Sequence, residues 1–496
     1  NVAFDGIDTA ATLAGPGARA LRKRMQMIFQ DPYASLNPRW IVQAIIGEPL
    51  REHGILSDKA ALKERVGELL QSVGLSPLDM GKYPHQFSGG QRQRISIARA
   101  LATQPDFLVC DEPTSALDVS VQAQVLNIMK DLQRQQGLTY LFISHDLGLV
   151  SDIADRVIVM YKGKIAEEGY TKDILTHPQH IYTKALLACR PALHKKGERL
   201  PVISDFIKED NQQQTVINEE TPKQHGIPGK QQALLSVEHL KVWYPSEKTF
   251  LGKITAYNKA VNDVSFEIYQ GETLGLVGES GCGKTTLGRA LLGLVPVTEG
   301  RILFNGRNLA GATPKEMIQY RKELQIIFQD PYSSLNPRKK IGDAIAEPML
   351  VHQLFSNKKQ RKEKVVELLE KVNLNADHYN RYPHEFSGGQ RQRIVIARAL
   401  ALEPSFVVCD ESVSALDVSV QAQVLNLLND LKSAFNFTAL FISHDLSVIR
   451  YISDRIMVMN NGIIDEWGDA EVIYHHPSRE YTKQLIEAIP GKKFAV

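Results

Sequence analysis

The chain has 496 residues, of which 43% are hydrophobic and 23% are charged, so a globular protein with at least two hydrophobic cores is expected and fibrous or disordered classes are excluded. The formal net charge of +2 is small and scattered, which argues against a nucleic-acid-binding face, and no apolar run approaches the roughly 18 to 20 residues that span a bilayer. The spacing of the four cysteines, Cys110, Cys189, Cys282 and Cys409, favours neither disulfides nor a zinc site and is typical of a reducing cytosol.

The sequence repeats itself over most of its length. The octapeptide Phe87–Arg94 returns 299 residues later as Phe386–Arg393. The same offset relates Gln30 to Gln329, Asp111 to Asp410, His145 to His444 and Tyr182 to Tyr481. A duplicated domain is therefore predicted, with copy one at 1–190, a polar linker at 191–232 and copy two at 233–496. Because 4–6 matches 304–306, copy one starts beyond the counterpart of a glycine-rich loop in copy two, and we expect an N-terminal segment to be missing from it.

A Ser-Gly-Gly-Gln turn stands in each copy, at Ser88–Gln91 and at Ser387–Gln390. Each turn precedes a segment whose apolar residues recur with a helical period, so each serine is predicted to cap a helix. The free N–H groups and the dipole of such a helix start make an anion-binding site. One isolated occurrence would be only a capped turn, but two occurrences within identical octapeptides favour the anion-binding interpretation.

Copy two contains a phosphate-binding loop. Gly278–Thr285 matches the pattern GxxxxGK[ST], follows the predicted strand Thr273–Val277 and opens a helix predicted from Lys284 to about Leu294. Its glycines let backbone N–H groups wrap a β-phosphate. Lys284 is expected to contact the β- and γ-phosphates of ATP, and Thr285 to bind Mg²⁺.

An apolar run ends in two carboxylates in each copy. Phe107–Asp111 is followed by Glu112, and Phe406–Asp410 is followed by Glu411. The runs predict buried parallel strands, and ligands bind at the carboxyl edge of such sheets. Asp410 can therefore hold the Mg²⁺ shell while Glu411 activates a water molecule against the γ-phosphorus.

These motifs, together with Gln329, Ser414–Asp417 and His444, follow one another in an order that resembles ABC-type ATPases, and the resemblance covers nearly the whole chain. It implies an α/β fold of two P-loop NTPase domains. Each would have a RecA-like parallel-sheet core, an antiparallel β subdomain and a helical signature subdomain. The implied activity is ATP hydrolysis, with ATP and Mg²⁺ as cofactors.

The resemblance also assigns roles to single residues. Gln30 and Gln329 would sense the γ-phosphate and touch a membrane partner, and Tyr244 would stack on adenine, with Trp243 and Tyr257 as alternatives. The catalytic residues implied are Glu112, His145, Glu411 and His444. The metal-binding residues implied are Asp111, Thr285, Gln329 and Asp410. The nucleotide-binding residues implied are Gly278, Glu279, Ser280, Gly281, Cys282, Gly283, Lys284, Thr285, Thr286, Gln329, Gln30, Tyr244, Ser88, Gly89, Gly90, Gln91, Ser387, Gly388, Gly389 and Gln390.

In such ATPases, each nucleotide lies between the phosphate loop of one domain and the signature helix of the other. The phosphate loop of copy two would therefore be closed by Ser88–Gln91 of copy one. Copy one has no phosphate loop within this chain, so one complete site is expected here. Ser412 and Val413 replace a Pro-Thr pair of copy one, which we interpret as a packing change. Cys282 lies within the phosphate loop, and its alkylation is expected to block hydrolysis.

Two further repeated segments narrow the resemblance. Phe29–Pro38 recurs at Phe328–Pro337, and His177–Lys184 recurs as the related segment His476–Lys483. Both are similar to dipeptide, oligopeptide and nickel importer ATPases, and the fusion of two domains resembles fused peptide-importer ATPases, including glutathione importers. The implied partners are two integral membrane permease subunits and a periplasmic or extracellular solute-binding protein. The chain would then lie peripherally at the cytoplasmic face of the inner membrane, touching it only through the permeases, with no nucleic acid bound. With only Cys189 nearby, no iron-sulfur cluster is expected in the tail.

Three other interpretations fit the sequence less well. A soluble tandem ABC ATPase acting on ribosomes or DNA would share the catalytic motifs, but it would carry a long charged linker or zinc-binding cysteine pairs. A scaffold without hydrolysis is disfavoured by Lys284, Glu411 and His444. A hydrolase triad at Ser443–Asp445 is rejected, because adjacent residues cannot align as nucleophile, base and orienter.

Overall fold

A computed structural model describes residues 2–115, 117–209, 233–248, 254–414 and 416–491. The chain divides into two compact units, one formed by 1–158 with 168–175 and the other by 159–167 with 176–496. Most of the predicted linker, 210–232, lies outside the described residues. Its described beginning contains a 3₁₀ turn and a short helix.

The first unit is built on a three-stranded parallel sheet in the order β3-β4-β5. Its elements are β1 (Ala3–Phe4), β2 (Ile7–Asp8), α1 (Thr9–Leu13), α2 (Ala18–Arg24), β3 (Met25–Ile28), α3 (Pro32–Ser35), α4 (Val42–Glu52), α5 (Lys59–Ser72), η1 (Pro77–Gly81), η2 (Pro84–Gln86), α6 (Gly89–Leu101), β4 (Phe107–Asp111), α7 (Val119–Gln136), β5 (Thr139–Ile143) and α8 (Leu147–Ile153). Apolar faces of α4, α5 and α6 form its core with the sheet. The β1–β2 hairpin turns at Asp5 and Gly6 with positive φ, as its counterpart in copy two does at Asn305 and Gly306.

The rest of copy one and the beginning of the predicted linker come next along the chain. They are β6 (Arg156–Tyr161), β7 (Lys164–Tyr170), α9 (Thr171–Thr176), α10 (Ile181–Ala188), η3 (Pro191–Leu193) and α11 (Ile203–Glu209). The segment from α10 onward belongs to the second unit. The Asn426 side chain there accepts from the Leu200 N–H at 3.0 Å and donates to the Leu200 carbonyl at 2.8 Å. Cys189 and Leu200 thus join the core of the second unit.

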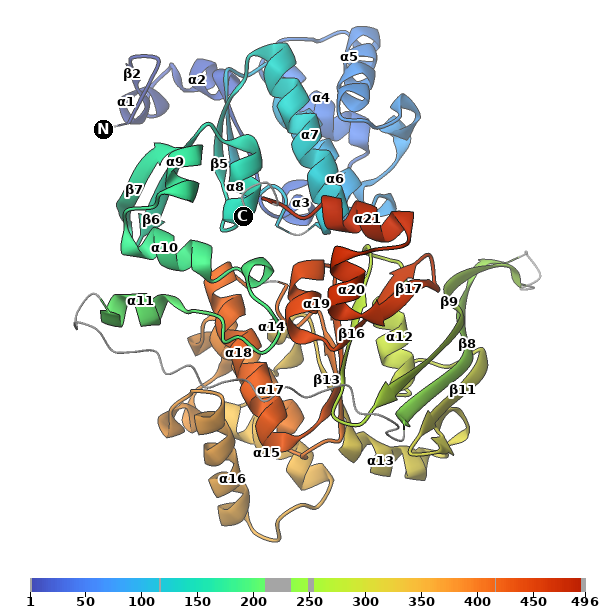
Figure 1. Cartoon of the computed structure of the whole chain (residues 1–496). Coiled ribbons are helices and arrows are strands. Elements are labelled where there is room, and N and C mark those ends of the chain that lie inside the picture. The colour runs from blue at the N-terminus through green and yellow to red at the C-terminus, as the bar shows by residue number, and fades with distance from the viewer. Residues whose placement is uncertain (1, 116, 210–232, 249–253, 415, 492–496) are drawn as a thin grey trace. The chain divides into compact units, whose positions relative to one another are not determined.

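The second unit has a six-stranded sheet in the order β13-β14-β15-β10-β16-β17, parallel except for the last pair, and a four-stranded antiparallel sheet in the order β12-β11-β8-β9 (Figure 1). Its elements are β8 (Ala233–Lys248), β9 (Ile254–Tyr269), β10 (Thr273–Val277), α12 (Lys284–Leu291), β11 (Glu299–Phe304), β12 (Arg307–Asn308), η4 (Leu309–Gly311), α13 (Pro314–Glu323), β13 (Leu324–Ile327), α14 (Pro331–Ser334), α15 (Ile341–Val351), α16 (Lys358–Lys371), η5 (Ala376–Asn380), η6 (Pro383–Glu385), α17 (Gly388–Leu400), β14 (Phe406–Asp410), α18 (Val418–Phe435), β15 (Thr438–Ser443), α19 (Leu446–Ile452), β16 (Arg455–Asn460), β17 (Ile463–Asp469), α20 (Ala470–His475) and α21 (Glu480–Glu487). The predicted α/β class is confirmed.

The strand before the phosphate loop lies in the middle of this sheet. β10 pairs in parallel with β15 on one side and with β16 on the other, and all five of its residues are buried. Helix α12 begins at Lys284 as predicted but ends at Leu291, three residues early. Gly293, with φ of +64°, and the bond from Leu294 N–H to the Arg289 carbonyl end the helix in a left-handed turn.

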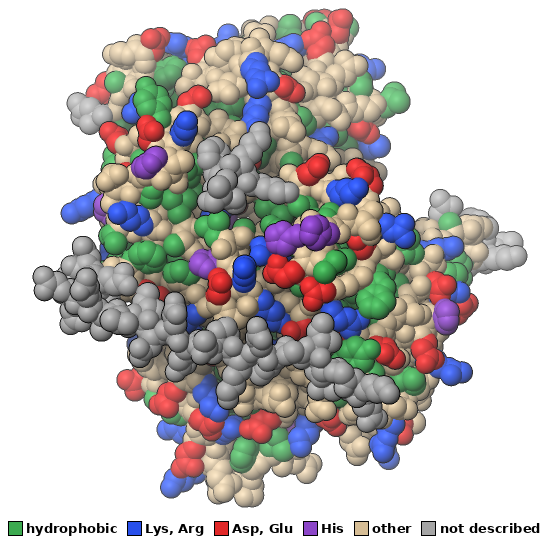
Figure 2. Space-filling model, in the orientation of Figure 1, with side chains coloured by type: hydrophobic (Ala, Val, Ile, Leu, Met, Phe, Trp, Pro, Cys, Tyr) green, Lys and Arg blue, Asp and Glu red, His purple; other side chains and the backbone are tan. Residues whose placement is uncertain are grey.

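The charge on the surface is mixed in sign (Figure 2). On the face shown in Figure 2, Lys and Arg side chains are interspersed with Asp and Glu side chains, as the small net charge predicts. None of the helices that the structure describes is long and apolar enough to cross a membrane.

Candidate nucleotide-binding site

The phosphate loop holds its lysine in a defined place. Lys284 is only 4% exposed, and its Nζ donates to the carbonyls of Gly278 at 2.7 Å and of Glu279 at 2.8 Å. The ammonium group therefore sits inside the loop at the first turn of α12, whose N-cap is Gly283. The positive charge and the helix start act at the same point, which suits the phosphates of a nucleotide.

Backbone carbonyls of β9 and β16 lie very close to two glycines of this loop. A Cβ built on Gly283 would lie 2.0 Å from the Ala260 carbonyl oxygen, and one built on Gly278 would lie 2.2 Å from the Met459 carbonyl oxygen. The N–H of Gly462 also donates to the Cys282 carbonyl at 2.9 Å. β9 and the β16–β17 turn thus fix the loop, and only glycine fits at the two closest approaches.

Two oxygen-bearing side chains meet beside the loop. The Thr285 hydroxyl donates to Asp410 Oδ1 at 3.0 Å, and Asp410 is 3% exposed at the carboxyl end of β14. Burial raises the pKa of Asp410 and the nearby Glu411 charge raises it further, while the Thr285 hydrogen bond opposes them. A hydroxyl and a carboxylate in contact form a donor set that suits Mg²⁺.

Glu411 is oriented by two side chains from the ends of neighbouring strands. Gln329 Nε2 donates to Glu411 Oε2 at 2.8 Å, and His444 Nδ1 lies 3.5 Å from the same oxygen. The backbone of Glu411 has a φ of +47°, an uncommon value for a residue with a side chain. Its N–H donates to the Ile442 carbonyl, which fixes this turn at the sheet edge. The three predicted residues are therefore brought together in copy two.

Copy one repeats this arrangement. Gln30 Nε2 donates to Glu112 Oε2 at 2.8 Å, and His145 Nδ1 lies 3.0 Å from Glu112 Oε1. Glu112 also has a positive φ, of +43°. Asp111 ends β4 just as Asp410 ends β14, so Glu112 and Glu411 follow equivalent strands. The cluster of glutamine, glutamate and histidine is therefore a property of the fold that both copies share.

The charges of Glu411 and His444 depend on each other. Burial works to lower the pKa of His444, but its hydrogen bond to Glu411 and the carboxylate charge outweigh burial, so the pKa is raised. Burial works to raise the pKa of Glu411, and the His444 contact outweighs it, so that pKa is lowered. Both shifts favour the ion pair near neutral pH.

This ion pair gives a pH-dependent prediction. Because the folded-state pKa of His444 lies above its unfolded value of about 6.5, its contribution is complete below about pH 6.5 and is lost as the pH rises through the folded-state pKa. We expect His444→Gln to destabilise the protein by about 1 kcal/mol at pH 6 and by clearly less at pH 9, measured by thermal unfolding.

His352 provides a control of opposite sign. Burial lowers its pKa, so its contribution should be lost as the pH falls rather than as it rises. The effect of His352→Gln should therefore be larger at pH 9 than at pH 6. A stability loss in His444→Gln that is the same at both pH values would contradict the ion pair.

The two signature turns form the capped helix starts that were predicted. Ser88 Oγ accepts from the Gln91 N–H at the start of α6, and Ser387 Oγ accepts from the Gln390 N–H at the start of α17. The two glycines of each turn differ. A Cβ on Gly389 would meet Val420 Cγ1 at 2.3 Å, while one on Gly388 would meet nothing within 4 Å. In copy one, a Cβ on Gly90 would likewise meet Val121 Cγ1 at 2.2 Å, but one on Gly89 would contact Leu117 Cδ2 at 3.8 Å, so only the packing role of the second glycine is common to both turns.

The structure also places Tyr244, the Ser412–Val413 pair and the rejected triad Ser443–Asp445. Tyr244 lies on β8 and is 38% exposed, opposite Asn258 of β9. Ser412 and Val413 are buried, which is consistent with a packing change. The Ser443 hydroxyl accepts from the Asp445 N–H, and Asp445 caps α19, so these residues form no triad with His444.

Cys282 lies within the loop, but its thiol is shielded. The residue is 7% exposed, and burial raises the pKa of its thiol despite the nearby Lys284 charge. A thiol that stays protonated reacts slowly with alkylating agents. Any block by alkylation should therefore be slow. Tyr481, which contacts the loop, is not among the predicted site residues, and its only signal in the sequence is its place in the repeated tail.

The fold and the site define a P-loop ATPase of the ABC class. The family profile described as ABC transporter matches residues 1–115 and 261–414, and that of the oligopeptide/dipeptide transporter C-terminal region matches residues 166–214. The chain therefore belongs to the ABC transporter family of ATP-binding proteins, and the prediction of an ATP-hydrolysing transporter subunit is confirmed.

Several relatives are similar over most of the chain. Glutathione import ATP-binding proteins of Escherichia coli (strain K12) and Shigella boydii serotype 4 (strain Sb227) are each 46% identical over 473 residues, which cover 94% of this chain and 74% of the relative. Among solved structures, a dimeric bacterial ABC transporter cassette aligns at 24% identity with a TM-score of 0.43, over 48% of this chain and 98% of its own.

Proposed function

We propose that this chain powers the import of a peptide-like solute, either glutathione or a short peptide, through partner permeases. The observation that carries the proposal is the phosphate loop of copy two with its buried Lys284, next to the cluster of Gln329, Glu411 and His444. The 46% identity to glutathione import proteins and the peptide-transporter profile at 166–214 support this class of cargo.

The side chains of copy two divide the work of hydrolysis. Lys284 would exchange its two carbonyl partners for the β- and γ-phosphates of ATP. Thr285 and Asp410 would hold Mg²⁺, with Gln329 completing the set, and the metal when bound neutralises phosphate charge. Glu411 would accept a proton from the attacking water, and His444 would keep the Glu411 carboxylate oriented and ionised.

The helix start at Ser88–Gln91 of copy one would complete this site across the nucleotide. The serine-capped start of α6 supports this role, because the N–H groups and the dipole of a helix start favour a phosphate. ATP binding would then draw the two copies together, and hydrolysis would release them. The equivalent residues Asp111, Glu112, His145 and Ser387–Gln390 would serve a second site if a phosphate loop were supplied to it.

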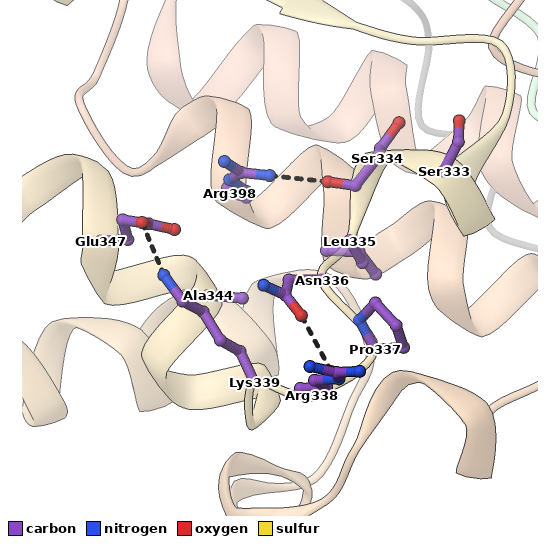
Figure 3. Close-up of a pocket in the computed structure, with 10 residues that line it drawn as sticks. All are labelled: Ser333, Ser334, Leu335, Asn336, Pro337, Arg338, Lys339, Ala344, Glu347 and Arg398. Atoms are coloured by element: carbon purple, nitrogen blue, oxygen red, sulfur yellow. Dashed lines mark hydrogen bonds and ion pairs between the residues drawn. The ribbon is translucent and has the colours of Figure 1, made fainter.

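A pocket of about 600 Å³ in the second unit supports a membrane partner. Figure 3 shows Arg398 of α17 donating to the Ser334 carbonyl, at 2.8 Å, and Lys339 paired with Glu347 of α15 at 2.7 Å across the lining. The pocket lining begins at Ser333 of α14, so one connection between β13 and α15 carries both the γ-phosphate sensor Gln329 and the surface on which a cytoplasmic helix of a permease would be seated. Two such permeases and an external solute-binding protein would place the chain at the cytoplasmic face of the inner membrane.

Uptake by reconstituted vesicles tests the proposal. The chain would be combined with two permeases and their solute-binding protein, and uptake of labelled glutathione and of a labelled dipeptide would be measured with ATP or with a non-hydrolysable analogue. We expect ATP-dependent uptake of one of the two solutes and faster ATP hydrolysis when the loaded binding protein is present. Stimulation by ribosomes or DNA without any uptake would instead support the soluble alternative.

A further inference from the structure

The C-terminal tail of copy two reaches back to the phosphate loop. Tyr481, on helix α21, accepts a hydrogen bond on its hydroxyl oxygen from the N–H of Glu279, at 3.0 Å. Glu279 is the second residue of the loop, and 202 positions separate the two residues in sequence. A residue of the tail thus contacts the backbone of the site.

Helix α21 is held firmly enough to place this hydroxyl. Glu466 of β17 accepts from the N–H of Ser478 at 2.7 Å, from its hydroxyl at 2.6 Å and from the Arg479 N–H at 3.3 Å. Thr482, Leu485 and Ile486 of the helix are buried, the last two in the core of the second unit. The position of Tyr481 is therefore set by the sheet and the core, and not by solvent-exposed contacts.

The bond acts on the peptide group between Gly278 and Glu279, whose carbonyl, that of Gly278, accepts from Lys284 Nζ at 2.7 Å. Glu279 gives its N–H to Tyr481 and its carbonyl to Lys284 Nζ, at 2.8 Å. Because the N–H and the carbonyl of one residue move with the same stretch of backbone, the tyrosine restrains the conformation in which the loop presents its lysine. On binding ATP, Lys284 has to leave this carbonyl while the loop keeps its shape.

We propose that Tyr481 is a positioning residue for ATP binding, and that helix α21 braces the phosphate loop from outside the nucleotide site. The inference rests on the proposed role of this loop in binding ATP. It means that a partner or a change that displaces the tail alters the affinity for ATP without touching a catalytic group.

Tyr481→Phe is the direct test, since it removes the acceptor and keeps the ring. A lost hydrogen bond of this kind corresponds to about a 3- to 10-fold weaker affinity. We expect KM and Kd for ATP to rise by that factor, with kcat within about twofold of the unchanged protein and the thermal midpoint nearly constant. Glu466→Gln, which loosens the turn before α21, should shift KM in the same direction.

Tyr474→Phe is the matched control. Tyr474 lies on α20, its ring packs on His475 and Arg450, and its hydroxyl makes no hydrogen bond within the described part of the chain. Lys284→Ala tests the proposed ATP site independently of Tyr481 and should abolish ATP binding. If Lys284→Ala does so and Tyr481→Phe leaves KM unchanged, or lowers kcat and stability instead, the positioning role is wrong. If Lys284→Ala keeps normal affinity, the proposed ATP site itself is wrong.

Discussion

Glu411→Gln is expected to lower the rate of ATP hydrolysis by about 10²- to 10⁴-fold, because an amide cannot take the proton of the attacking water. The substitution is nearly isosteric, and an amide oxygen can still accept the bond from Gln329. Lys284 and the loop remain unchanged, so ATP should still bind and the ATP-bound state should accumulate. Hydrolysis is measured as phosphate release under saturating ATP, and binding is measured by equilibrium titration.

Glu403→Gln makes a close control for this change. Glu403 also has a left-handed backbone, with φ of +51°, but its side chain is 61% exposed and pairs with Lys364. It should hydrolyse ATP at the normal rate. Retained hydrolysis in Glu411→Gln would remove Glu411 as the catalytic base, whereas loss of ATP binding in the same variant would point to a structural role.

The parts of the site that are formed by one continuous stretch of chain could be predicted from the sequence, because all the residues of each motif are neighbours in it. The strand β10, the loop and the start of α12 lie in one continuous stretch, and each serine cap lies directly before its helix. The meeting of Gln329, Glu411 and His444 has a topological cause. These residues follow β13, β14 and β15, which are parallel neighbours, so their carboxyl ends share one edge.

Other contacts depend on packing that no short pattern reports. The approach of the Ala260 and Met459 carbonyls to the loop comes from β9 and β16, and Met459 lies more than 170 residues after the loop. The same holds for the bond from Glu279 to Tyr481 and for the paired bonds of Asn426 with Leu200. The repeat at an offset of 299 marked Tyr481 as a shared position, but it could not say what the hydroxyl touches.

Gly283→Ala is expected to weaken ATP binding on the order of 100-fold, because the loop cannot keep its shape with a side chain at this point. The added Cβ would lie 2.0 Å from the Ala260 carbonyl oxygen and 2.8 Å from Met459 Cε. The first neighbour is backbone of the long strand β9, where the residues on either side, Lys259 and Val261, pair with β8 and restrain it. The backbone φ of +112° adds strain for any residue other than glycine.

The expected loss in unfolding free energy for Gly283→Ala is about 1 to 3 kcal/mol, as for other overpacked sites, so the variant should still fold and its ATP affinity can be titrated. Gly271→Ala separates backbone strain from collision. Gly271 has a φ of +77° in the turn before β10, and the nearest atom to its added Cβ is Asn436 Oδ1 at 3.9 Å. This control should lose about 1 kcal/mol of stability and keep its ATP affinity. Equal affinities in the two variants would mean that β9 does not shape the loop, because of these two glycines it is Gly283 that meets that strand.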